Sequence, residues 1–230
     1  MQEEVVLPKI YNDPFGNYPQ HLGKPKVSYS QLNSFKDAMY KGSYFGQYFL
    51  GVPDDGNIFS DFGGKCGEYW EKEEVSDLNE ADIEILKDNL DRPEGARYEV
   101  EIVVDRGFYV IQGFIDFELE VKPKCLEIID LKTGNHKDKP AFYASDTYQQ
   151  TTLYSYQREK EGNTIEYSGV KLLERKGNGA EKYPLKLSGK IKEIPTPYSK
   201  ERAERFLAEV DKTVLEISKY YKAYKKLFVS

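Results

Sequence analysis

Hydrophobic and polar residues alternate along the middle of the chain in the period of two that is typical of β-strands. The stretch 98–104 alternates and is rich in β-branched residues, and the turn 105–107 separates it from a second such stretch. Residues 126–131 are apolar on both faces apart from the ends of the stretch, which favours a central, buried strand. The five predicted strands cover residues 98–104, 108–119, 126–131, 165–175 and 185–194.

Helical spacing of apolar residues dominates elsewhere. Ser28 and Gln31 have the spacing of a capping box, and Leu32, Phe35 and Met39 follow at helical intervals. A first helix is predicted to begin near residue 28. Four further helices are predicted over residues 63–72, 79–90, 145–160 and 199–227. This order of elements predicts a mixed α/β fold, with a central mixed sheet of about five strands flanked by helices.

The first 26 residues are rich in Pro, Gly and Asn and predict an irregular arm, so we expect a single domain over 27–230. Hydrophobic residues make up 39% and charged residues 31%, a balance that excludes a disordered chain. No apolar run reaches membrane-spanning length, and residues 1–6 lack the apolar core of a secretory signal. With only two cysteines, Cys66 and Cys125, we expect a reduced, cytoplasmic setting.

Candidate chemistry gathers on two neighbouring predicted strands. Asp130 and Lys132 are two residues apart, so both side chains project from one face of their strand. Asp116 lies on the preceding strand, and a hairpin would bring its carboxylate to the same place. Buried carboxylates need a partner, and oxygen ligands suit Mg²⁺ or Mn²⁺. An isolated Asp-x-Lys is more often a solvated ion pair, so the surrounding elements decide the interpretation.

Two further elements could complete such a site. Gln150 and Tyr154 are four residues apart and share a face of the helix that follows Lys132. Glu68, on an earlier predicted helix, could supply another carboxylate, although an acidic residue on a helix usually faces solvent. We interpret the remaining polar residues near these segments as solvated, incidental or pointing elsewhere: Glu118, Glu120, Glu127, Gln149, His21 and His136.

Five segments in order resemble the motifs of the RecB-like, lambda-exonuclease-like branch of the PD-(D/E)XK nuclease superfamily. They are residues 27–35, 62–68, 113–116 (Gly-Phe-Ile-Asp), 128–134 (Ile-Ile-Asp-Leu-Lys-Thr-Gly) and 150–154 (Gln-Thr-Thr-Leu-Tyr). The resemblance implies a restriction-endonuclease-like core and a nuclease dependent on Mg²⁺ or Mn²⁺. It implies that Asp116 and Asp130 bind metal, that Lys132 acts on the water or the phosphate, and that Gln150 and Tyr154 align the substrate.

Two departures from the pattern are informative. Gly67 occupies the position of the family's histidine, so we assign the third metal ligand to Glu68. Relatives with an iron–sulfur cluster use four cysteines, and this chain has two, so we expect no cluster.

The expected function is DNA cleavage, as an exonuclease in recombination, repair or phage DNA processing, in the host-cell cytoplasm if the chain is phage-encoded. Linear single- or double-stranded DNA is the expected partner, and a homo-oligomer or a recombination partner protein stays open. Two alternatives also stay open: a protein of this fold that binds nucleic acid without cutting it, or a nuclease for RNA or branched junctions. The net charge of −6 argues against nucleic acid when taken alone, but carboxylates gathered for metal ions contribute to it.

Overall fold

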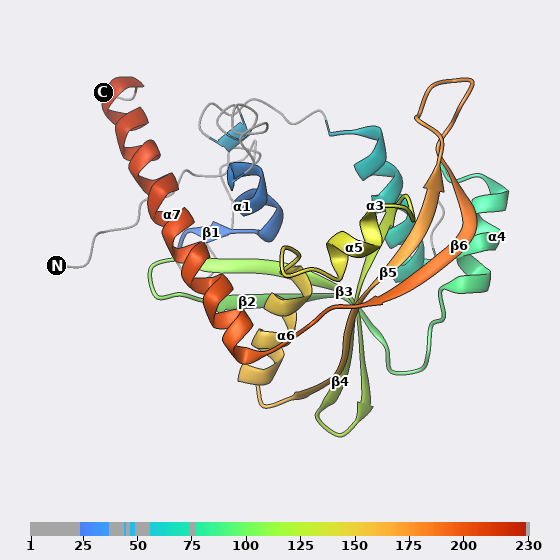
Figure 1. The fold of residues 1–230 in the computed structure, drawn as a ribbon, viewed down its shortest axis with the longest axis horizontal. Helices are drawn as coiled ribbons and strands as arrows, with labels where there is room; N and C mark the ends of the chain where they lie inside the picture. The colour runs from blue at the N-terminus through green and yellow to red at the C-terminus, as the bar shows by residue number, and fades with distance from the viewer. Residues whose placement is uncertain (1–23, 37–43, 45–46, 49–55, 74–76, 229–230) are drawn as a thin grey trace. The chain divides into compact units, whose positions relative to one another are not determined.

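The structure is a computed structural model that describes residues 24–36, 44, 47–48, 56–73 and 77–228. The elements that Figure 1 labels are, in chain order, β1 (Lys26–Val27), α1 (Tyr29–Lys36), α3 (Ile58–Lys72), α4 (Glu80–Asn89), β2 (Arg97–Asp105), β3 (Val110–Lys122), β4 (Cys125–Gly134), α5 (Lys139–Tyr143), α6 (Gln150–Lys160), β5 (Thr164–Lys176), β6 (Lys186–Pro195) and α7 (Lys200–Phe228). None of these helices combines the length and apolar character needed to cross a bilayer.

The strands form one mixed sheet in the order β1-β3-β4-β5-β6, with β2 also paired to β3 (Figure 1). The β3–β4 and β5–β6 pairs are antiparallel, and β4–β5 is parallel. The mixed α/β prediction is therefore confirmed, with β4 central as its two apolar faces indicated. The strand missed by the sequence is β1, which pairs with β3 through Lys26 and Val27 alone and is too short to show a period.

The chain packs as two compact units. One comprises 1–55, 102–113 and 204–230, and the other 56–101 and 114–203. All the predicted site residues lie in the second unit. The prediction of one domain over 27–230 stays a prediction, and 1–23 of the predicted arm lie outside the described residues.

In the first unit, the predicted capping box is present at the start of α1. The amide of Gln31 donates to Ser28 Oγ, and the amide of Ser28 donates to Gln31 Oε1, both at 3.2 Å. Farther along the chain, Asp211 of α7 accepts hydrogen bonds from Tyr109 Oη at 2.6 Å and from Arg106 Nη2 at 2.5 Å.

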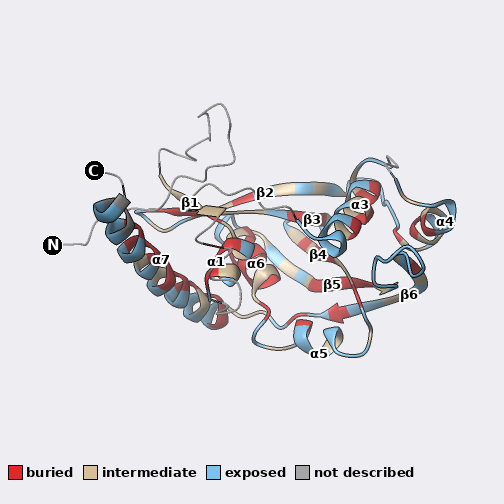
Figure 2. Ribbon diagram, turned by 90° about the horizontal axis from the view of Figure 1, so that it is seen from above, coloured by how far each residue is buried: buried red, intermediate tan, exposed pale blue. Residues whose placement is uncertain are grey.

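In the second unit, helix α3 packs on the sheet through large side chains. The Trp70 ring stacks on Phe117 of β3, with centroids 5.0 Å apart and planes within 4°. Phe62, Cys66 and Tyr69 are buried on the same helix. Figure 2 shows the resulting stripes of buried and exposed residues along α3.

Two helix boundaries differ from the predictions. Helix α3 begins at Ile58, five residues before Gly63, because the Asn57 side chain caps it by accepting from the amides of Phe59 and Ser60 at 3.1 and 2.9 Å. The helix predicted from 145 begins at Gln150. The residues before it form a loop, and the separate short helix α5 was not predicted.

Arg202 explains this late start. It is 5% exposed, and its Nη2 donates to the backbone oxygens of Ser145 and Tyr148 at 3.1 and 2.8 Å. These two carbonyl groups are thereby bonded to a side chain, and the loop is held in place from the start of α7.

Candidate active site

The β3–β4 hairpin brings Asp116 and Asp130 to one place. The register pairs Phe117 with Ile129, so Asp116 immediately precedes the paired stretch on β3 and Asp130 immediately follows it on β4. The Leu131 amide donates to Asp116 Oδ2 at 2.6 Å, which fixes the Asp116 carboxylate beside β4. The hairpin predicted from the sequence is confirmed.

The two oxygens of Asp130 have different surroundings. Asp130 is fully buried, and its Oδ2 accepts from Tyr148 Oη at 2.6 Å and pairs with Lys132 Nζ at 2.5 Å. Its Oδ1 is also buried, yet no hydrogen-bond partner for it exists among the residues that the structure describes. A buried carboxylate oxygen without a partner costs free energy, so Oδ1 is the atom in this site that calls for a ligand.

The charges of the site act on one another. Burial raises the pKa of Asp116 to about 7, and the charge of Asp130 adds to the rise, while Lys132 opposes it. Burial alone would lower the pKa of Lys132, but the charges of Asp130 and Asp116 raise it above its ordinary value. Lys132 is therefore a cation that pairs with Asp130 and is also stabilised by the charge of Asp116.

Helix α6 presents its first turns to this cluster. Gln150 Nε2 donates to Tyr154 Oη at 2.5 Å, so the two side chains share a helix face as predicted. Burial, and then the charges of Asp130 and Asp116, raise the pKa of Tyr154 well above its ordinary value, which keeps its hydroxyl protonated. Gln149 points elsewhere, toward Arg202, whose Nε lies 3.3 Å from Gln149 Oε1.

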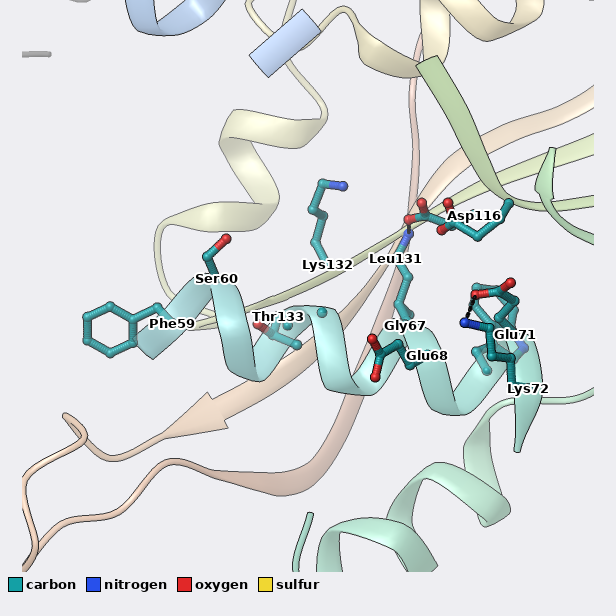
Figure 3. Close-up of a pocket in the computed structure, with 14 residues that line it drawn as sticks. Phe59, Ser60, Gly67, Glu68, Glu71, Lys72, Asp116, Leu131, Lys132 and Thr133 are labelled. Carbon is teal, nitrogen blue, oxygen red and sulfur yellow. Dashed lines mark hydrogen bonds and ion pairs between the residues drawn. The ribbon is translucent and has the colours of Figure 1, made fainter. Parts of the chain in front are cut away.

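A cavity of about 610 Å³ is lined by α3 and by residues of β2, β3 and β4, among them Asp116 and Lys132 (Figure 3). Glu68 lines the same cavity from α3 and is exposed. No three His, Cys, Asp or Glu side chains come together as a metal-binding group within the described part of the chain. The site thus joins two carboxylates, and the metal role of Glu68 stays a prediction.

The family model of the PD-(D/E)XK nuclease superfamily matches residues 57–224. The chain belongs to the PD-(D/E)XK nuclease superfamily. No curated protein sequence matches it. Among solved structures, it is similar to a protein from Eubacterium rectale described as a candidate exonuclease, with 14% identity, a TM-score of 0.52, and coverage of 90% of this chain and 86% of that one.

PD-(D/E)XK nucleases typically use divalent metal ions, and the residues present fit such an ion. Asp116 and Asp130 offer hard carboxylate oxygens, which suit Mg²⁺ and Mn²⁺. Asp130 Oδ1, which is buried and has no partner among the described residues, is the oxygen that a cation at this site would use.

Gly67, which the motif resemblance predicts to be at the position of the superfamily's histidine, lines the cavity. A Cβ atom built at Gly67 would meet no atom within 4 Å. The backbone at this position therefore has room for a Cβ atom.

Sequence reasoning missed two residues of the site. Tyr148, the donor to Asp130 Oδ2, lies two residues before α6 and was one tyrosine among 19, with no spacing that marked it. Glu99 of β2 lines the cavity with a left-handed backbone (φ +47°), and burial and the charge of Glu71 raise its pKa. Only alternation of side chains was visible around Glu99, and alternation does not reveal a strand irregularity.

The prediction that Glu118 is solvated was wrong. Glu118 is fully buried, and its Oε2 pairs with Arg158 Nε of α6 at 2.5 Å. Arg97 binds the other oxygen, Oε1. Arg158 is four residues after Tyr154, so one face of α6 reaches both the Asp130 cluster and this buried ion pair.

Proposed function

We propose that the chain is a metal-dependent deoxyribonuclease that hydrolyses phosphodiester bonds with Asp116, Asp130 and Lys132. The observation that carries the proposal is the Asp130 carboxylate, which has Oδ2 fixed by Tyr148 and Lys132 and Oδ1 buried without a described partner. Asp116 and Asp130 would hold Mg²⁺ or Mn²⁺. When bound, such an ion polarises a phosphate oxygen and lowers the pKa of a bound water.

The protein's own residues divide the remaining work. Lys132 keeps its positive charge because the charges of Asp130 and Asp116 raise its pKa, and this charge can orient the attacking water or stabilise negative charge on the phosphate oxygens. The Leu131 amide holds the Asp116 carboxylate in place, so that it need not reorganise when the substrate arrives. Tyr148 does the same for Asp130.

Gln150 and Tyr154 would align the substrate from α6. The hydrogen bond from Gln150 Nε2 to Tyr154 Oη, 2.5 Å long, fixes the two side chains relative to each other. Because the pKa of Tyr154 is raised, its hydroxyl stays protonated and can donate to a phosphate oxygen. Correct alignment of the reacting atoms is a large part of catalysis in phosphoryl transfer.

Exonuclease action in DNA recombination, repair or phage DNA processing is the form of the activity that we propose. The similarity in fold to the Eubacterium rectale candidate exonuclease supports it. The cavity beside Asp116 has a volume of about 610 Å³, which is enough to receive part of a DNA strand.

The test is cleavage of end-labelled linear DNA, circular DNA, RNA and a branched junction with Mg²⁺, Mn²⁺ or EDTA. We expect metal-dependent loss of linear DNA, with circular DNA spared. Asp130→Asn should reduce the rate by more than about 100-fold, beyond the 10- to 100-fold typical of residues that only orient a ligand. Asp88→Asn, at an exposed aspartate of α4, is the matched control and should cleave normally.

Three results would overturn parts of the proposal. Cleavage that survives Asp130→Asn would remove the site assignment. Binding of DNA without cleavage by any metal would favour a protein that only binds nucleic acid. Faster cleavage of RNA or junctions than of linear DNA would change the substrate.

A further inference from the structure

Phe59 is an aromatic side chain that faces the cavity instead of the core. It lies in the first turn of α3, lines the same cavity as Asp116 and Lys132, and is 39% exposed. Figure 3 shows its ring at the N-terminal end of α3, while Asp116 lies toward the other half of the helix. Large apolar side chains exposed at a cavity rim commonly mark a place where a ligand packs.

The neighbouring Ile58 is also exposed, by 48%, but its side chain has a close neighbour. Ile58 meets the turn between β5 and β6, where a Cβ built at Gly179 would lie 1.9 Å from Ile58 Cδ1. Gly179 has φ +81° and leaves the space that Ile58 fills. Neither Ile58 nor Phe59 belongs to the buried hydrophobic cluster of this unit.

Arg175 of β5 holds the Phe59 ring in place. Its guanidinium carbon lies 4.1 Å from the ring centroid, and its Nη1 donates to the Phe59 backbone oxygen at 3.4 Å. A cation over an aromatic face is a stabilising contact. The pair is an ordered aromatic surface with a positive charge behind it, in a chain whose net charge is −6.

The path from Phe59 toward Asp116 is open along α3. Ser60, Gly64 and Gly67 line the cavity in between, and a Cβ at Gly64 or Gly67 would meet nothing within 4 Å. From Phe59 to Gly67 the helix rises about 12 Å, at about 1.5 Å per residue, which is the length of a few nucleotides along one strand.

We propose that Phe59, backed by Arg175, is a stacking platform for an unpaired nucleobase of the substrate, a few nucleotides from the bond that is cut. This inference rests on the proposed nuclease function and specifies its substrate as nucleic acid with a single-stranded or frayed end. In a duplex, both faces of a base are covered by its neighbours, whereas an unpaired base offers a free face to an aromatic ring.

The test begins with the affinity of fluorescently labelled (dT)20 for the full chain, measured by anisotropy in EDTA so that the strand is not cut by metal-dependent cleavage. Phe59→Ala should raise Kd at least about fivefold, the equivalent of the ~1 kcal/mol lower bound for one base–aromatic stack. Phe59→Trp should bind within about twofold of the wild type, because it keeps a stacking surface. Phe108→Ala, at a phenylalanine that is 46% exposed and does not line the cavity, is the matched control and should also stay within about twofold.

Phe59→Trp adds a direct signal. Trp70 is the chain's one tryptophan and is buried, so the new indole supplies the exposed fluorescence. Stacking of a base should quench this fluorescence when (dT)20 is added. A spectrum that does not change while the strand binds would overturn the platform.

A scan of one abasic nucleotide along the (dT)20 strand separates stacking from a general loss of affinity. Phe59→Ala should cost little further affinity when the abasic position is the one that stacks, and its full cost elsewhere. The inference fails if Phe59→Ala behaves like Phe108→Ala, or if the cost is the same at every abasic position.

Cleavage of the same strand with Mg²⁺, measured in parallel, tests the nuclease activity separately from the stacking platform. If the wild type cuts and Phe59 has no effect on binding, the platform falls and the nuclease stands. If binding depends on Phe59 and nothing is cut, the nuclease falls and the platform stands.

Discussion

The Tyr148 hydroxyl donates to Asp130 Oδ2 at 2.6 Å, and both residues are buried. The contact joins the loop before α6 to the end of β4. Because Lys132 binds the same oxygen, the carboxylate cannot rotate without losing two partners, and Oδ1 is kept in one place. Tyr148 is thus a positioning residue for the proposed metal ligand.

Removal of this hydroxyl should weaken metal use without unfolding the protein. We expect Tyr148→Phe to lower activity about 10- to 100-fold and to raise the Mn²⁺ concentration needed for half-maximal rate, as is typical when a ligand loses its orienting partner. A metal titration of the cleavage rate measures both. Tyr183→Phe, at a tyrosine that is 65% exposed, is the control. An unchanged metal dependence in Tyr148→Phe would show that Lys132 alone fixes Asp130.

Metal affinity should rise with pH through neutrality. Asp116 has a pKa of about 7 in the metal-free protein, so below that pH a cation must displace its proton. We expect tighter Mn²⁺ binding and less proton release at pH 8 than at pH 6, measured by calorimetry in buffers of different ionisation enthalpy. Equal affinity at both pH values would contradict the raised pKa of Asp116.

The raised pKa of Asp116 also makes the free energy of unfolding depend on pH. Between the unfolded value near 3.8 and about 7, the folded protein holds a proton on Asp116 that the unfolded chain has lost. The contribution of Asp116 to the free energy of unfolding therefore falls as pH rises through this window. In urea unfolding without metal, Asp116→Asn should flatten this part of the pH dependence, and Mn²⁺ should restore stability to the wild type at pH 8.

Two glycines of α3 should respond differently to alanine. Gly67→Ala should raise the free energy of unfolding by about 0.5–1 kcal/mol, because glycine is a poor helix former and the new Cβ meets no atom within 4 Å. At Gly63 the Cβ would lie 3.2 Å from Thr133 Oγ1, so we expect a smaller gain or a loss. Urea unfolding of both variants measures the difference, and a greater loss at Gly67 would disprove the open space at that position.

The buried pair of Glu118 and Arg158 should be costly to break from one side. Arg158→Met leaves Glu118, which is 0% exposed, with less compensation, and such losses typically cost about 3–5 kcal/mol. The double variant Glu118→Gln, Arg158→Met should recover part of the loss. Lys212→Met, which breaks an exposed pair with Glu209, should cost at most about 1 kcal/mol. If Arg158→Met and Lys212→Met cost similar free energies of unfolding, burial does not strengthen the Glu118–Arg158 pair.

The centre of the site could be predicted because it depends on local geometry. The period of two places Asp130 and Lys132 on one face of β4, and one short hairpin brings Asp116 beside them. The period of 3.6 likewise predicts that Gln150 and Tyr154 meet. The first of these relationships spans 16 residues of chain, from Asp116 to Lys132, and the second spans four.

The residues that were missed depend on how separate elements pack. Tyr148 reaches Asp130 because Arg202, more than 50 residues later, holds the loop before α6. Glu118 of β3 pairs with Arg158 of helix α6, 40 residues later in the chain and outside the β3–β4 hairpin. The alternation along a strand predicts which face of the sheet a residue such as Glu118 occupies, but it does not predict which element packs on that face.

In Asp130, Oδ2 is held by Tyr148 and Lys132, whereas Oδ1 has no partner among the described residues. This difference between the two oxygens affects whether position 130 can accept aspartate or glutamate. The superfamily's motif allows aspartate or glutamate here, but in this chain Tyr148 and Lys132 fix the length of the side chain by holding Oδ2. A glutamate would carry its carboxylate one methylene farther, into a fully buried space where Tyr148 already stands. The residue at 148 and the choice of acid at 130 are therefore expected to change together, so that a chain with glutamate at this position would need a smaller side chain at 148.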